Sequence, residues 1–243
     1  NGNEYKFSQL EKTKEFGGKG AGSGTLKEDA ELTSLKEQLE KAKKIEKKNF
    51  INLKVKNKIH HVSFADTTPG TPKSDFHLLD KDGNEVVWIS HKDGSTAKDF
   101  QQWGGISQRS EPTVFRHNEV QNFIKDLKTD YPNGLPRATT LYRHINDRTL
   151  KMIAVYGNQF PTRREGRQNC SILLQGPVRL NKIGSNYQLS SNHVHYNGDS
   201  VDGQGFDPVL MAIYKGDRSD AGVKGTRIVI SPVGGRKGKE YAK

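Results

Sequence analysis

Short runs of alternating apolar and polar residues predict a protein built largely from strands. Residues 52–56 and 59–64 alternate around a turn and are expected to pair as a hairpin. Residues 73–80 and 85–92 are more apolar, and they flank a turn that contains Asp82-Gly83. Asp-Gly between two apolar runs is a strong signal for a tight hairpin turn. A second hairpin is therefore predicted over residues 73–92.

Helical spacing is confined to a few segments. Residues 25–47 are expected to form a helix, because apolar side chains recur every three or four positions. These side chains are Leu32, Leu35, Leu39, Ala42 and Ile45. Thr25 and Glu28 fit a capping box at its start. A second amphipathic helix is predicted over 117–127, and a helical turn over 99–103.

The second half of the chain is expected to form an antiparallel or mixed sheet. Its apolar runs are separated by Gly, Asn and Asp clusters, which favour turns. The predicted strands are 150–156, 171–174, 178–183, 209–214 and 227–230.

Together these elements predict an α/β (α+β) protein with a central mixed sheet flanked by helices. The expected division is a glycine-rich lead (1–24), a core (25–136) and a β-rich basic subdomain (137–243). The glycines of 17–24 favour a hinge or linker, with backbone contacts to phosphate as the alternative.

Composition excludes several classes of protein. Of the 243 residues 32% are hydrophobic, and the sequence lacks the run of about 20 apolar residues that a membrane span needs. A secretory signal is not expected, because the sequence does not start with a charged segment that is followed by an apolar stretch. Cys170 is the single cysteine, which excludes an internal disulfide and a multi-cysteine zinc site. An intracellular protein is expected.

The net charge of +11 is unevenly distributed. Residues 1–60 carry +5, residues 61–136 carry −3 and residues 137–243 carry +9. An acidic middle between basic flanks suits a protein that holds a cation with carboxylates and DNA phosphates with Lys and Arg. By charge alone, a merely basic protein without nucleic-acid function fits as well.

The hairpin over 73–92 carries the candidate chemistry. Asp75 lies at the start of one strand and Lys92 at the end of the other, so their side chains are expected to meet. This layout, with Ser90 two residues before the lysine, resembles the PD-(D/E)XK (restriction-endonuclease-like) nuclease superfamily in its Ser-X-Lys variant. Ser90 departs from the usual second carboxylate and is a poorer ligand for a hard cation.

The resemblance implies further residues. It implies a Mg²⁺ site, with Mn²⁺ as the alternative cation, held by Asp75 with help from Glu28 or a backbone carbonyl. Glu28 has a second interpretation as a helix cap. Gln101 or Gln102 resembles a glutamine that follows the lysine strand in some members, although a surface helix explains at least one of the two.

Basic residues in the second half are candidates for DNA contact. Arg163, Arg164 and Arg167 lie in one loop, and arginine forks suit phosphates and guanine edges. Lys73 is expected to join them in binding DNA. A basic tail, 236–239, is a further candidate. His193-Val194-His195 sets two imidazoles on one strand face, but without a third ligand nearby surface histidines explain them better.

The leading hypothesis is a Mg²⁺-dependent endonuclease that hydrolyses phosphodiester bonds of double-stranded DNA. The alternative is a non-catalytic DNA-binding protein on the same fold, and a third is an interaction protein with a basic surface. The style of the sequence favours a phage or mobile-element origin, which would place the protein in the host cytoplasm. Many such enzymes act as homodimers, although the sequence indicates no interface.

Overall fold

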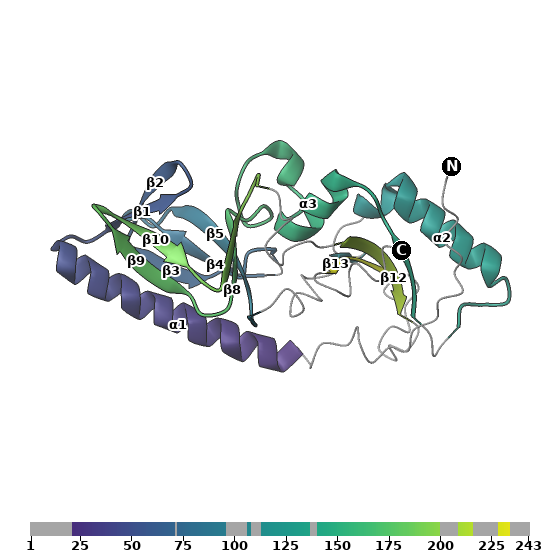
Figure 1. Ribbon diagram of the computed structural model, residues 1–243, viewed down its shortest axis with the longest axis horizontal. Helices are drawn as coiled ribbons and strands as arrows, with labels where there is room; N and C mark the ends of the chain where they lie inside the picture. Colours follow the sequence, from purple (N-terminus) through teal and green to yellow (C-terminus); the bar gives the residue numbers. More distant parts are fainter. Residues whose placement is uncertain are drawn as a thin grey trace. The chain divides into compact units, whose positions relative to one another are not determined.

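The computed structural model describes residues 21–70, 72–95, 106–107, 113–136, 140–199, 209–215 and 228–233. Within these ranges the chain is a mixed α+β protein, mostly strands, with three α-helices and three sheets (Figure 1). The predicted fold class is therefore confirmed. The described part of the chain contains no helix of the length and apolar character needed to cross a membrane.

The described residues form two compact units. The first, the hairpin unit, consists of residues 21–95 and 156–199, and the second, the α2 unit, contains 106–155 and 209–233 with the gaps given above. Each unit draws segments from both sides of residue 136, where the sequence analysis placed a boundary.

The hairpin unit contains one long helix, a single 3₁₀ turn and two sheets. Its elements are α1 (Ala21–Glu46), β1 (Ile51–Val55), β2 (Lys58–Val62), β3 (Phe64–Thr67), β4 (Phe76–Leu79), β5 (Glu85–Lys92), η4 (Phe160–Thr162), β8 (Ile172–Gln175), β9 (Arg179–Ile183), β10 (Asn186–Ser190) and β11 (His193–Tyr196). One sheet has the order β2-β1-β10-β9 and the other β11-β8-β5-β4-β3.

Both predicted hairpins of the first half are present. β1 and β2 pair antiparallel, with Leu53 opposite His60. β4 and β5 pair antiparallel, with Phe76 opposite Ile89. β8 then joins β5 in parallel and β11 closes that sheet antiparallel, which makes the sheet mixed.

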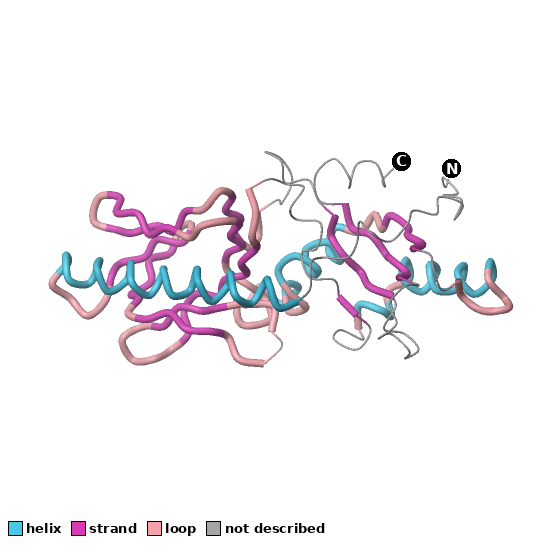
Figure 2. Tube along the Cα trace, turned by 90° about the horizontal axis from the view of Figure 1, so that it is seen from below, coloured by secondary structure: helices cyan, strands magenta, loops and turns pink. Residues whose placement is uncertain are grey.

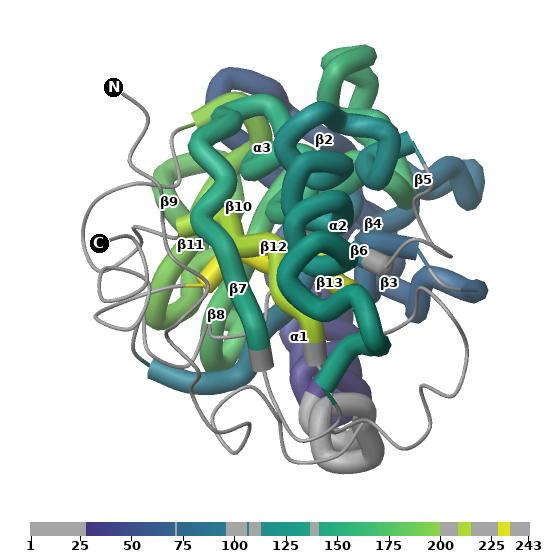
Figure 3. The backbone as a smooth tube through the Cα atoms, turned by 90° about the vertical axis from the view of Figure 1, so that its right-hand side faces the viewer, coloured from purple at the N-terminus to yellow at the C-terminus, as the bar shows by residue number. Residues whose placement is uncertain are grey.

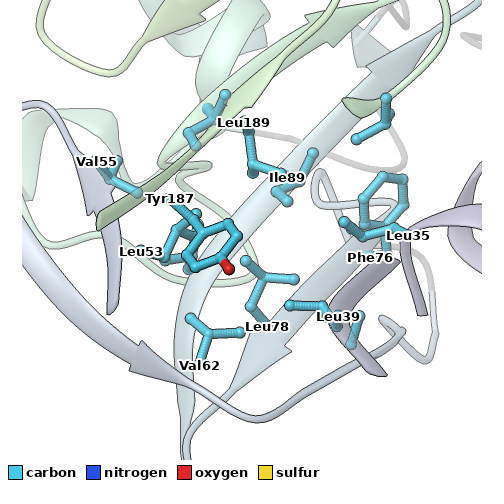
Figure 4. Close-up of a cluster of buried hydrophobic side chains, with 14 of the residues drawn as sticks. Leu35, Leu39, Leu53, Val55, Val62, Phe76, Leu78, Ile89, Tyr187 and Leu189 are labelled. Carbon is cyan, nitrogen blue, oxygen red and sulfur yellow. The ribbon is translucent and has the colours of Figure 1, made fainter. Parts of the chain in front are cut away.

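α1 lies along the two sheets and supplies one wall of the core (Figure 2). Leu35 and Leu39 meet Leu53, Phe76 and other buried side chains from both sheets (Figure 4). This arrangement follows from the three-to-four residue spacing of the leucines on α1, which places them on one face.

The ends of α1 differ from the prediction. Ile45 is 68% exposed and does not belong to the core face. The helix begins at Ala21, so Thr25 is inside it and a capping box at Thr25 is wrong. The final glycines of the expected 17–24 linker are helical, and the earlier ones lie outside the described residues.

The α2 unit packs two helices on one sheet. Its elements are β6 (Ile106–Ser107), η3 (Val114–Arg116), α2 (Asn118–Asp130), β7 (Thr140–His144), α3 (Arg148–Tyr156), β12 (Val209–Lys215) and β13 (Ile228–Val233), although Tyr156 at the end of α3 belongs to the hairpin unit. The sheet order is β6-β13-β12-β7. α2 lies against this sheet (Figure 3), with Val120, Phe123 and Leu127 buried among its side chains. The predicted second helix is confirmed.

One predicted strand is wrong. Residues 150–156 form most of α3, not a strand. Leu150 and Ala154, one helical turn apart, are both in the core, and neighbouring residues are largely buried too. An apolar run buried on several sides does not distinguish helix from strand by its period. Asp147 accepts a hydrogen bond from the Leu150 backbone N–H at 2.7 Å, an N-cap that marks the helix start.

The other four predicted strands correspond to β8, β9, β12 and β13. The helical turn predicted over 99–103 lies outside the described residues.

Candidate active site

The β4–β5 hairpin brings Asp75 and Lys92 to the same end of the sheet. Its turn is fixed by Asp80, whose carboxylate accepts the backbone N–H groups of Asp82 and Asn84, each at 2.9 Å. Gly83 has φ +82°, a conformation that favours glycine. Because the turn sets the register, the residue before β4 lies beside the last residues of β5.

Asp75 is held by the three consecutive residues Ser90, His91 and Lys92. Its Oδ2 accepts the backbone N–H of His91 at 2.6 Å and the Ser90 hydroxyl at 3.2 Å. The Lys92 Nζ lies 3.4 Å from the same oxygen. The predicted approach of Asp75 and Lys92 is therefore present in the structure, and Ser90 also contacts Asp75.

The two oxygens of Asp75 differ. All three hydrogen bonds end on Oδ2, and within the described part of the chain none reaches Oδ1. The Asp75 side chain is about one-fifth exposed, while Ser90 is buried. The hydroxyl of Ser90 and the backbone N–H of His91 thus orient the Asp75 carboxylate through Oδ2.

Glu28 approaches this cluster from α1. Burial raises the pKa of Glu28, and the nearby Asp75 carboxylate raises it further, while Lys92 acts in the opposite direction. Glu28, Asp29 and Asp75 line one pocket of about 200 Å³, together with Thr68 and Ser74. Since α1 begins seven residues earlier, Glu28 does not cap its first turn, and the cap interpretation is wrong.

Glu28 and Asp75, the two partly buried carboxylates of this pocket, fit a hard cation. Like charges at short range disfavour joint ionisation, and a cation between them would remove that penalty. Mg²⁺ is commonly held by only one or two carboxylates, with water and substrate phosphate completing its shell. Glu28 and Asp75 are close enough for the Asp75 carboxylate to raise the pKa of Glu28, and within the described ranges no group of three or more His, Cys, Asp and Glu side chains gathers around a common point.

A second lysine lies beside the cluster. Lys73 is partly buried, and burial lowers its pKa to about 8, with Lys92 acting in the same direction. Cys170 is close enough to be affected: burial raises the pKa of its thiol to about 12, while Lys73 opposes that rise. Two lysines and two carboxylates therefore share one end of the sheet.

Gly176 is a site-supporting residue that the sequence analysis missed. Its backbone N–H donates to the Lys92 carbonyl at 2.8 Å, and its own carbonyl lies 2.8 Å from His91 Nε2. Gly176 thus holds the end of β5 from the neighbouring strand. The Gly176-Pro177 dipeptide between the predicted strands 171–174 and 178–183 was the available signal.

The loop that carries the predicted DNA-binding arginines is exposed. Arg163 and Arg164 are exposed, and Arg163 has φ +57° after the 3₁₀ turn η4. Arg167 is also exposed but is engaged by Glu85, whose Oε1 lies 2.5 Å from its Nη2. The DNA contacts themselves stay a prediction.

Other predicted candidates do not join the site residues. His193 and His195 are on β11, partly buried, and no metal-ligand group of three forms around them in the described part of the chain. Gln101, Gln102 and the basic tail 236–239 lie outside the described residues.

Comparison with known proteins adds one relative. The chain is 28% identical over 126 residues to the Type II restriction enzyme CviJI of Paramecium bursaria Chlorella virus IL3A. The aligned part is 51% of this chain and 34% of that enzyme, so the chain matches about a third of the length of its curated relative. No protein-family model matches the chain, and no solved structure matches it. Over about half of its length, the chain is thus similar to a viral restriction enzyme.

Proposed function

We propose that this protein is a metal-dependent endonuclease that hydrolyses phosphodiester bonds of double-stranded DNA. The observation that carries the proposal is the geometry around Asp75: Lys92 Nζ lies 3.4 Å from one carboxylate oxygen, and Asp75 lines the same pocket as Glu28. The similarity to a restriction enzyme supports the same class of reaction. The site would be a Ser-X-Lys variant of the PD-(D/E)XK nucleases.

Each residue of the cluster would have its own role in cleavage. Asp75 and Glu28 would hold Mg²⁺, with Mn²⁺ as an alternative. When bound, the cation would polarise the scissile phosphate and lower the pKa of a bound water. Lys92 would stabilise the negative charge that develops on the phosphate and orient the attacking water. Ser90 replaces the usual second carboxylate only as a hydrogen-bond donor that fixes Asp75.

DNA binding would rest on the exposed loop. Arg163 and Arg164 present guanidinium groups to solvent, which suits phosphate oxygens. Lys73 would add positive charge next to the cleavage site. The net charge of +11 would favour binding to the negatively charged phosphates of the duplex.

The test is cleavage of supercoiled and linear duplex DNA by the purified protein in Mg²⁺, Mn²⁺ or EDTA. Wild type is compared with Asp75→Asn and Lys92→Ala. Asp82→Asn and Lys58→Ala are matched controls, because both residues are exposed and lie in the same unit away from the cluster. The expected result is metal-dependent cutting that falls at least about 100-fold in both site variants and is kept in both controls.

Two outcomes would contradict the proposal. Cutting in EDTA at the wild-type rate would contradict the role of a cation. Salt-sensitive DNA binding without cutting in any cation would favour the non-catalytic DNA-binding alternative.

A further inference from the structure

Arg167 is bound by its side chain to the start of the lysine strand. Its Nε lies 3.0 and 3.1 Å from the two carboxylate oxygens of Glu85, the first residue of β5. Arg167 holds the pKa of Glu85 below its usual value, although burial of Glu85 acts against this. A guanidinium that grips a carboxylate in this way has fewer donors left for a phosphate.

Arg167 is bound by its backbone to the segment that carries Asp75. Its carbonyl oxygen accepts the backbone N–H groups of Lys73 at 3.1 Å and Ser74 at 3.0 Å. The next residue, Asp75, donates its own N–H to Ile89 at 2.8 Å. One arginine therefore contacts both arms of the hairpin, through different groups.

Buried polar side chains continue this connection. Glu85 also accepts the Trp88 indole N–H at 2.7 Å and lies 3.5 Å from His77 Nε2. The other ring nitrogen of His77 lies 3.1 Å from Thr68 Oγ1, which is 3.1 Å from Ser74 Oγ. The backbone and side chain of Ser74 are thus both fixed, immediately before Asp75.

The loop that carries Arg163, Arg164 and Arg167 is itself held by hydrogen bonds. Asn169, which is fully buried, donates from its side chain to the Arg164 carbonyl at 2.9 Å. Gly166 and Asn169 exchange backbone hydrogen bonds at 2.9 and 3.0 Å. These hydrogen bonds therefore fix the backbone of the loop between Arg164 and Arg167.

We propose that Arg167 is a positioning residue, which sets the distance between the phosphate-binding arginines of this loop and the Asp75 carboxylate. Arg163 and Arg164 would contact DNA phosphates, whereas Arg167 would transmit their position to the cleavage site. This inference rests on the proposed nuclease function. The physical reason is that catalysis is sensitive to small displacements, and a misplacement of about 1 Å can lower a rate about 100-fold.

The experiment separates binding from turnover in the full chain. Arg167→Ala, Arg164→Ala and Arg179→Ala are compared for cleavage rate at saturating DNA, for Kd in EDTA and for the salt dependence of Kd. Arg179 is an exposed arginine on β9 and serves as the matched control. We expect Arg167→Ala to lower the rate about 10- to 100-fold with Kd changed less than about twofold. Arg164→Ala should instead weaken binding and reduce the salt slope by about one.

A second measurement reads the connection without cleavage. Hydrogen exchange at the Lys73 and Ser74 amides should become at least about tenfold faster in Arg167→Ala than in wild type and Arg179→Ala, because their acceptor loses its anchor on Glu85. The conservative Arg167→Lys variant should recover part of the cleavage rate, because one contact to Glu85 remains.

The outcomes are distinguishable. A wild-type protein that never cleaves DNA would overturn the proposed function, while faster amide exchange would still establish the connection to the Asp75 segment. Unchanged exchange in Arg167→Ala would overturn the inference. So would a loss of affinity and salt slope equal to that of Arg164→Ala with an unchanged rate, since Arg167 would then be an ordinary phosphate contact.

Discussion

Replacement of Gly176 by alanine should disturb the candidate site from a neighbouring strand. Gly176 has φ +86°, and a Cβ placed there would overlap the side-chain amide of Asn192 and lie 2.9 Å from the Gly94 carbonyl oxygen. Asn192 Nδ2 donates to that same carbonyl at 3.1 Å. The alanine would therefore displace Asn192 and press on the segment that follows Lys92.

The magnitude can be worked out against a matched glycine. Gly83 has φ +82°, and a Cβ added there would meet no atom within 4 Å, so Gly83→Ala carries only the backbone strain, about 1 kcal/mol. Gly176→Ala carries the same strain, together with the lost Asn192 hydrogen bond of about 1 kcal/mol. Crowding against a backbone oxygen adds about 1 kcal/mol. Gly176→Ala should thus lower the free energy of unfolding by about 3 kcal/mol and Gly83→Ala by about 1 kcal/mol.

The assay is urea unfolding in a Trp103→Phe background, so that Trp88 fluorescence reports the hairpin unit alone. DNA cleavage is measured in parallel under conditions where both variants are fully folded. Because Gly176 contacts the backbone of Lys92 and the side chain of His91, we expect the cleavage rate to fall in Gly176→Ala and not in Gly83→Ala. Equal losses of stability in the two variants would refute the argument from crowding.

Three further predictions concern stability and reactivity. Leu35→Ala, in a fully buried side chain, should lower the free energy of unfolding by about 3 kcal/mol, whereas Ile45→Ala, 68% exposed, should change it by less than about 0.5 kcal/mol in the same urea assay. Arg167 lowers the pKa of Glu85 from its usual 4.5. Ionised Glu85 therefore stabilises the folded protein above pH 4.5, and this stabilisation is lost as the pH falls through the lower pKa that Glu85 has in the folded protein. The urea midpoint of Glu85→Gln should consequently depend less on pH below 4.5 than that of wild type, and an identical dependence would contradict the pairing. Buried Cys170, with its pKa raised to about 12, should react with a thiol reagent at pH 8 at least about 1,000-fold more slowly in the native protein than in urea, and rapid native labelling would contradict its burial.

The sequence predicted those elements whose signals are local. The Asp82-Gly83 turn and its flanking apolar runs were sufficient for the β4–β5 hairpin, and hence for the approach of Asp75 and Lys92. The leucine spacing of α1 was also sufficient for its core face. The strand prediction for residues 150–156 was wrong because an apolar run that is buried on several sides has no clear period. Asp147, which caps the helix, was the local signal for a helix at this position.

Contacts between distant segments were less accessible. The position of Glu28 near Asp75 was suggested only by a family resemblance, because no local pattern relates a helix to a strand end 47 residues later. Arg167 was predicted to bind DNA because it lies in an arginine-rich loop. Its pairing with Glu85 depends instead on the parallel contact between β5 and β8. Such pairings are set by tertiary packing and leave no periodic trace in the sequence.

The parallel pairing of β5 with β8 also has a consequence for the order in which the protein is made. Ile89 lies opposite Ile172, and β1 pairs in parallel with β10, so both sheets of the hairpin unit need strands from its late segment. A ribosome therefore releases Asp75 and Lys92 well before Arg167 and Gly176, which hold them in place. The contacts that hold Asp75 and Lys92 are completed only after the later segment has emerged, so the proposed nuclease activity would begin late in synthesis.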